Sequence, residues 1–109
     1  MFRLDLKVVV HINQNERFQH GVDNINNLIN GEEKVEICLV LTGEPVKLAT
    51  SDSRIKHLLD KGVAVSVCRN AIAHFEVEKK DLIKGVVVVP GGALECIRKQ
   101  NPGLAYLKP

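Results

Sequence analysis

Short apolar segments alternate with segments of helical spacing along the chain, and this alternation constrains the fold more than any other feature. Strands are predicted over residues 4–12, 34–43, 62–68 and 86–92, with a short terminal strand or extended tail over 103–109. Helical segments are predicted between them, over residues 14–30, 51–62, 71–75, 78–85 and 93–100, and a loop over 43–50. Such an order is typical of a parallel sheet covered by helices. We therefore expect an α/β fold, a three-layer α/β/α sandwich with a mainly parallel sheet of four to five strands.

The length of the chain fits one domain. Its 109 residues can bury a core without disulfide or metal staples. No internal repeat, low-complexity linker or shift in composition divides them. We expect a single domain over residues 1–109.

Charge and hydropathy exclude several partners. The chain has 15 basic and 13 acidic residues, and this near balance gives no electrostatic reason to expect nucleic acid or a membrane surface. Aromatic residues make up 4% of the chain, too few for a base-stacking platform. No apolar run approaches the roughly 18 residues that span a bilayer. The N-terminal segment lacks a signal-peptide layout and is predicted to be the first strand, so the expected compartment is the cytoplasm.

The usual cofactor and metal motifs are missing from the sequence. There is no GxGxxG after the first predicted strand and no GxxxxGK[ST]. The four histidines show no metal-ligand spacing, and no CxxC pair is present. An odd count of three cysteines argues against a disulfide framework. We expect no cofactor and no metal.

The carboxyl ends of the predicted strands carry the candidate site residues. Ligands of open parallel sheets bind beyond this edge. The residues that follow the strands there include His11 and Asn13, Thr42, Cys68, and the pair Gly91 and Gly92. Cys68 therefore lies at the expected functional edge, whereas Cys38 lies in mid-strand among apolar neighbours and Cys96 on a predicted helix. We expect a packing role for Cys38, and packing or half-exposure for Cys96.

Cys68 has two interpretations. Asn70 is a suitable N-cap for a helix over residues 71–75, and a thiol just before such a helix would meet free backbone N–H groups and the positive end of the helix dipole. Arg69 adds a cation nearby, and together these features favour the thiolate, which is the reactive form. Alternatively, Cys68 is packed at the strand end as a small apolar side chain.

The segment GVAVSVCRNAIAHFEV and the later LIKGVVVVPGGALECIRKQNPGLAYLKP resemble the DsrE/DsrF-like family, small α/β proteins of intracellular sulfur metabolism. The resemblance covers nearly the whole chain. In sulfur-relay members a cysteine at the end of this strand carries sulfur as a persulfide, which implies that role for Cys68 alone. The family often has an asparagine two residues later, matched by Asn70. It often has a polar residue after the proline of the fourth strand, where this chain departs with Gly91. The resemblance also implies a homotrimer or homohexamer with the site near a subunit interface.

Two functions of different classes follow. The first is a sulfur carrier or sulfurtransferase-like protein that accepts and passes on persulfide sulfur at Cys68, together with donor and acceptor proteins. Arg69, Asn70, His11, Asn13, Gly91 and Gly92 would support the site. The second is a non-catalytic oligomeric module that binds a small anion or metabolite, with Cys68 in the wall of its pocket. A rhodanese is less favoured, because NAIAHF after Cys68 and Arg69 suits a helix better than a loop of backbone donors.

Overall fold

The computed structural model describes residues 6–31, 34–92, 95 and 105–109. It contains five strands, β1 to β5, over Leu6–Ile12, Val35–Leu41, Ala64–Cys68, Val87–Val89 and Ala105–Leu107. Three α-helices are described, α1 over Phe18–Ile29, α2 over Ser53–Asp60 and α3 over Arg69–His74. Three 3₁₀ turns, η1 to η3, cover Asn15–Arg17, Glu44–Thr50 and Lys79–Asp81.

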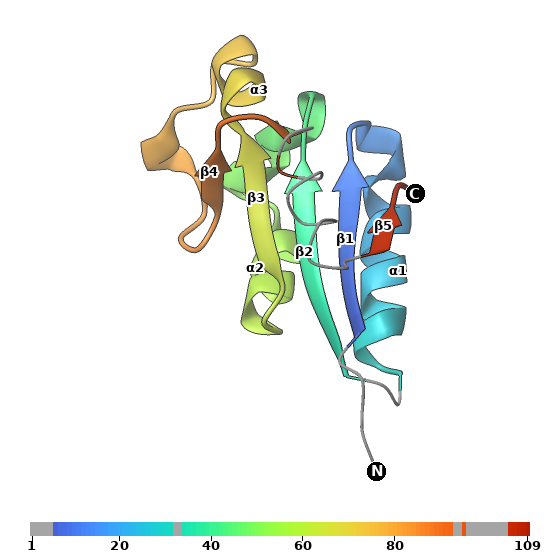
Figure 1. Ribbon diagram of the computed structural model, residues 1–109. Helices are drawn as coiled ribbons and strands as arrows, with labels where there is room; N and C mark the ends of the chain where they lie inside the picture. Colours follow the sequence, from blue (N-terminus) through green and yellow to red (C-terminus); the bar gives the residue numbers. More distant parts are fainter. Residues whose placement is uncertain (1–5, 32–33, 93–94, 96–104) are drawn as a thin grey trace.

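The strands form one five-stranded sheet in the order β4-β3-β2-β1-β5, and all of its neighbouring strands are parallel. The predicted α/β class with a mainly parallel sheet is confirmed. The chain moves outward from β1 to β4 and then returns to add β5 on the other side of β1 (Figure 1). The strand order therefore reverses between β1 and β5, which is where open α/β sheets commonly bind ligands.

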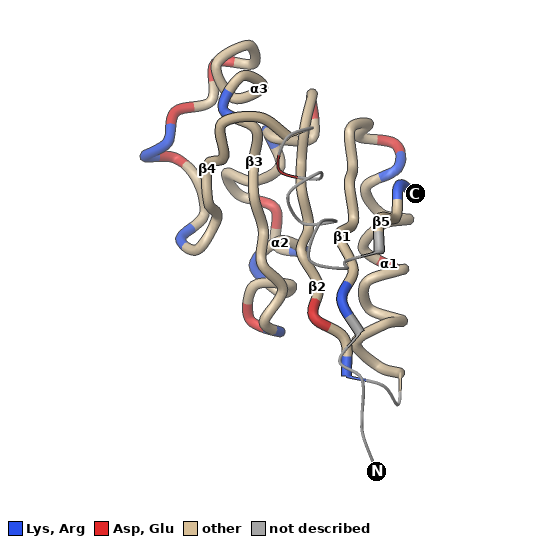
Figure 2. Tube along the Cα trace, viewed as in Figure 1, with Lys and Arg blue, Asp and Glu red and all other residues tan. Residues whose placement is uncertain are grey.

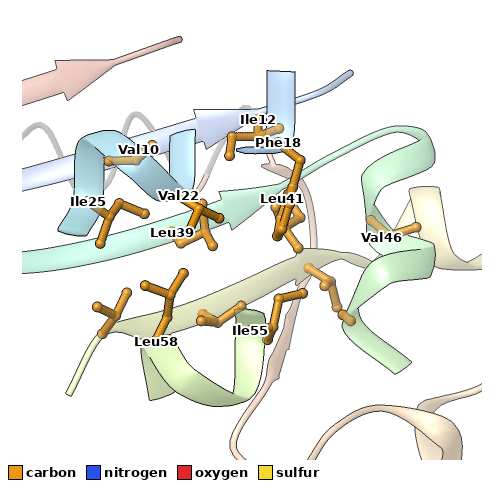
Figure 3. Close-up of a cluster of buried hydrophobic side chains, with 14 of the residues drawn as sticks. Val10, Ile12, Phe18, Val22, Ile25, Leu39, Leu41, Val46, Ile55 and Leu58 are labelled. Carbon is orange, nitrogen blue, oxygen red and sulfur yellow. The ribbon is translucent and has the colours of Figure 1, made fainter. Parts of the chain in front are cut away.

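One face of the sheet packs against α1 and α2. Alternate residues of β1, β2 and β3 point to this face because successive strand side chains point to opposite sides. Figure 3 shows the resulting apolar cluster between the sheet, α1, α2 and η2. Its labelled members are Val10, Ile12, Phe18, Val22, Ile25, Leu39, Leu41, Val46, Ile55 and Leu58. All ten are buried.

A second, smaller apolar cluster lies on the opposite face. It consists of Val9, Cys38 and Val40, all buried. Cys38 thus has the packed mid-strand position expected for it. The helix predicted over residues 93–100, including Cys96, lies outside the described residues apart from Glu95.

Two local predictions need correction. The segment 43–50, predicted to be a loop, contains the 3₁₀ turn η2, which begins after Gly43 with its φ of 64° and has Pro45 near its start. The helix predicted from residue 14 begins as an α-helix at Phe18 and is preceded by η1.

Arg54 of α2 contacts both Asp52, the N-cap residue of α2, and residues of α1. The side chain of Asp52, its N-cap, accepts a hydrogen bond from the backbone N–H of Arg54 at 2.9 Å. The Arg54 guanidinium donates to Asp52 and to Gln19 and lies 4.5 Å from the centre of the Phe18 ring. These contacts connect the first turn of α2 with the first turn of α1.

Figure 2 shows that charged residues lie on the helices, the connections and the amino ends of the strands. The carboxyl halves of β1 to β4 contain no Lys, Arg, Asp or Glu. The charges at this edge therefore come from residues that follow the strands, such as Glu44 after β2 and Arg69 after β3.

Candidate functional site at the carboxyl edge of the sheet

Cys68 is the last residue of β3 and lies at the edge where the arrowheads of β1 to β4 end (Figure 1). It has extended backbone angles, φ −74° and ψ 126°, and it occupies the N-cap position of α3. Its exposed fraction is 8%, and it contacts the main apolar cluster. The thiol is thus at the expected edge but is largely covered by its neighbours.

The predicted N-cap at Asn70 is wrong. Strand β3 runs directly into α3, so Cys68 takes the N-cap position and Asn70 becomes the second residue of the helix. Arg69 and Asn70 are both exposed. Because α3 has only six residues and Cys68 makes no side-chain cap hydrogen bond, the helix terminus gives little support for an activated thiol.

Because Gly92 has no side chain, the segment after β4 can lie close to the carboxyl ends of β2 and β3. A Cβ placed on Gly92 would overlap the Thr42 methyl group and would lie 3.3 Å from Thr42 Cβ and 3.6 Å from Cys68 Cβ. The register pairs Leu41 with Val67, so Thr42 and Cys68 follow side by side on β2 and β3. Only a residue without a side chain fits between these two groups.

Three hydrogen-bonded side chains, Tyr106, His11 and Thr42, form a row across β5, β1 and β2 on the face of the sheet that holds Cys38. His11 of β1 lies between two hydroxyl groups: its Nδ1 is 2.7 Å from the Tyr106 hydroxyl on β5, and its Nε2 is 2.8 Å from Thr42 Oγ1 after β2. The rings of His11 and Tyr106 also contact each other, with centroids 5.9 Å apart. Tyr106, His11, Thr42 and Cys68 therefore come from four consecutive positions in the sheet, β5-β1-β2-β3.

The surroundings of His11 favour the neutral form of its imidazole. Partial burial, which disfavours the charged ring, is the larger cause that lowers its pKa below the usual value of 6.5, and the nearby positive charge of Lys108 lowers the pKa further. Other titratable side chains on this face of the described strands include Cys38, Cys68 and Tyr106, and Lys7 and Glu36 occupy register-paired positions at its far end.

This shift predicts a measurable pH dependence of stability. Because the pKa of His11 is lower in the folded chain, the unfolded chain binds more protons between the folded pKa and 6.5. We expect the free energy of unfolding to fall as pH falls through this window, and the decline to end below the folded pKa. An NMR titration of the imidazole should give a midpoint below 6.5, moved up but not restored by Lys108→Ala, since burial is the larger cause. A midpoint at or above 6.5 would contradict this reading.

The structure places the remaining predicted site residues at the same edge without joining them to the row. Asn13 follows β1 and is exposed, and its backbone carbonyl oxygen lies 3.0 Å from where a Gly43 Cβ would be. Gly91 is partly exposed, and its carbonyl accepts a hydrogen bond from the Glu95 N–H at 2.9 Å. No side-chain contact of Asn13 with Cys68 or His11 is found within the described residues.

No role was assigned to Thr42 or Tyr106 from the sequence. Thr42 was placed at the carboxyl edge, as the end of the second predicted strand, but was not counted among the supporting residues. The position of Tyr106 depends on β5 returning beside β1, and no local pattern encodes that. Among the described residues, no group of three or more His, Cys, Asp or Glu side chains could hold a metal ion.

The structure is that of an α/β protein with an all-parallel sheet, and a cysteine and a row of polar side chains lie at the carboxyl edge of that sheet. The family model of the DsrE/DsrF-like family matches residues 7–109. The chain therefore belongs to the DsrE/DsrF-like family, as the sequence resemblance predicted.

Solved structures with the same fold come from several organisms. A protein of unknown function from Methanobacterium thermoautotrophicum, MTH1491, is 30% identical, with a TM-score of 0.90 over 96% of this chain and 100% of that one. The ychN protein from E. coli is 16% identical, with a TM-score of 0.79 over 96% and 99% of the two chains. A conserved protein of unknown function from Bacteroides thetaiotaomicron, BT1422, is 20% identical, with a TM-score of 0.75 over 94% of each. The last two show the fold alone. The comparison with curated proteins finds no match.

Proposed function

We propose that this protein is a sulfur carrier that accepts sulfur as a persulfide on Cys68 and passes it to an acceptor thiol. The family is generally associated with sulfur relay. The observation that carries the proposal is the position of Cys68 at the carboxyl end of β3, where parallel sheets present their ligand sites.

The chemistry needs neither a metal nor an organic cofactor. The Cys68 thiolate attacks the terminal sulfur of a donor persulfide, a new S–S bond forms, and the donor S–S bond breaks with its electron pair leaving on the donor thiolate. The persulfide on Cys68 then loses its terminal sulfur to an acceptor thiolate by the same exchange. Each step conserves charge, and no external oxidant or reductant is required.

The assembly and the partners belong to the same proposal. A homotrimer or homohexamer, together with donor and acceptor proteins, would bring the exchanging sulfurs together at an edge where Cys68 is only 8% exposed. A reducing compartment such as the cytoplasm would keep the thiol available. No helix in the described part of the chain is long and apolar enough to cross a membrane.

A second candidate function rests on that low exposure. A cysteine that contacts the core cluster and stands beside a row of polar side chains also suits the wall of a binding pocket for a small anion or metabolite. In that case Cys68 packs as a small apolar group and exchanges no sulfur.

Thiol alkylation distinguishes the two functions. If Cys68 is a working thiol, iodoacetamide at neutral pH should modify it before Cys38, which is 5% exposed and lies in the middle of the sheet. Peptide mapping over time would give the rate at each cysteine. Modification of Cys68 only under conditions that unfold the chain would support the binding module and contradict the carrier.

A further inference from the structure

The proposed function leaves the hydrogen-bonded row beside Cys68 without a role. The row contains Tyr106, His11 and Thr42. Tyr106 forms the outer end of the row and is 43% exposed. Polar side chains that meet on the apolar face of a parallel sheet need a reason, because each must be satisfied there. The row ends at Thr42, which stands next to Cys68 on the neighbouring strand.

We propose that the Thr42 hydroxyl donates a hydrogen bond to the terminal sulfur of a persulfide on Cys68, and that His11 and Tyr106 orient this hydroxyl. The inference rests on the proposed function, because it assigns a role to Thr42 only while Cys68 carries sulfur. It adds Thr42 as a residue that contacts the transferred sulfur, with His11 and Tyr106 as positioning residues.

Distance supports a contact with the second sulfur. Neighbouring strands lie about 4.8 Å apart, and side chains at paired positions point to the same face. A Cβ placed on Gly92 would lie 3.3 Å from Thr42 Cβ and 3.6 Å from Cys68 Cβ, so these two side chains begin close together. A persulfide extends the cysteine side chain by one S–S bond of about 2.05 Å, a step that can bring the terminal sulfur within reach of Thr42.

The hydrogen-bond roles within the row support a donor at Thr42. A neutral imidazole has one N–H donor and one acceptor nitrogen. When Tyr106 donates to Nδ1, the Nε2–H of His11 donates to Thr42 Oγ1, and the hydroxyl proton of Thr42 is left for another acceptor. A persulfide is anionic, and hydrogen bonds to charged acceptors are the stronger ones.

Gly92 restricts the orientation of Thr42 from the other side. The Thr42 methyl group occupies the space beneath Gly92, while Oγ1 is held by His11. With two of the three substituents on Thr42 Cβ fixed in this way, χ1 has a single favoured setting. The row and the glycine together hold the hydroxyl ready before sulfur arrives.

A pair of substitutions at Thr42 separates the hydroxyl from the shape of the side chain. Thr42→Val keeps the branched shape and removes the hydroxyl, whereas Thr42→Ser keeps the hydroxyl and removes the methyl group. Sulfur uptake from glutathione persulfide, followed by intact mass, should slow about tenfold in Thr42→Val, as expected for loss of a hydrogen bond to a charged group. Thr42→Ser should remain within about twofold of the wild type by retaining the donor. Equal uptake in the wild type and Thr42→Val would overturn the inference while leaving the carrier proposal standing.

Two further readouts exclude a merely structural role. Alkylation of Cys68 by iodoacetamide forms no terminal sulfur, so its rate in Thr42→Val should stay close to that of the wild type, and an equal loss in both reactions would overturn the inference. Long-range ¹H–¹⁵N NMR should show His11 protonated on Nε2, and a ring protonated on Nδ1 alone would contradict the assigned roles. If the wild type takes up no sulfur at all, the carrier proposal and this inference both fail.

Discussion

Replacing Cys68 by serine is expected to abolish uptake of sulfur from a persulfide donor while the protein remains folded. The hydroxyl of serine is nearly the same size as the thiol but is neither ionised near neutral pH nor able to form a persulfide. Cys68 makes no side-chain cap hydrogen bond, so none is lost, but it packs against the main apolar cluster, and the buried hydroxyl should lower the free energy of unfolding without abolishing folding. Intact mass after exposure to glutathione persulfide, together with thermal unfolding, measures both parts of the prediction.

The matched control is Cys38→Ser. Cys38 is buried between Val9 and Val40 in the middle of the sheet, so a hydroxyl there should lower the free energy of unfolding without affecting sulfur uptake. Sulfur uptake by Cys68→Ser at the wild-type rate would show that another thiol is the carrier.

Gly92→Ala is expected to destabilise the protein and to disturb the site together. The added Cβ would overlap the Thr42 methyl group and crowd Cys68, so the segment after β4 must move away from the ends of β2 and β3. Overpacking of this kind typically costs about 1–3 kcal/mol in the free energy of unfolding. The rate of Cys68 alkylation should change as well, and denaturant unfolding and peptide mapping would measure the two effects.

Gly31→Ala provides the comparison. The nearest atom to a Cβ at Gly31 is the Leu28 carbonyl oxygen at 3.4 Å, and Gly31 is exposed after α1. We expect its effect on unfolding to be within about 0.5 kcal/mol, as for most surface substitutions. If Gly92→Ala proved as mild as Gly31→Ala, the close approach of Gly92 to Thr42 and Cys68 would be refuted.

The sequence was a good guide to the class of fold. Alternating apolar residues, as in β2 and β3, predicted strands, and stretches with helical spacing predicted the helices between them. The parallel arrangement followed from that alternation, because parallel strands need crossover connections. The burial of Cys38 in mid-strand was predictable for the same reason.

Boundaries were less accessible because they depend on tertiary contacts. Nothing local distinguishes a helix that begins at Arg69 from one that Asn70 caps, yet the direct passage from β3 into α3 decides it. The 3₁₀ turn at 44–50 buries Val46 and Ala49 against the core, and this packing was not visible in a segment read as a loop.

The candidate site could be predicted only in part. The carboxyl-edge rule selected His11, Cys68 and Gly92 from their positions after strands. It could not join His11 to Tyr106, because that pair is 95 residues apart and meets only through the return of β5 to β1. The row therefore depends on the order of the strands in the sheet, and that order could not be predicted from the sequence.

Localisation of the sulfur atom by mass spectrometry tests the central claim most directly. The wild-type protein would be exposed to glutathione persulfide, digested without reductant after the remaining thiols are blocked, and mapped. The account predicts that the peptide containing Cys68 gains the mass of one sulfur atom, and that this mass is lost again on addition of an acceptor thiol. A gain on the peptides of Cys38 or Cys96 instead, or no gain on any peptide, would contradict it.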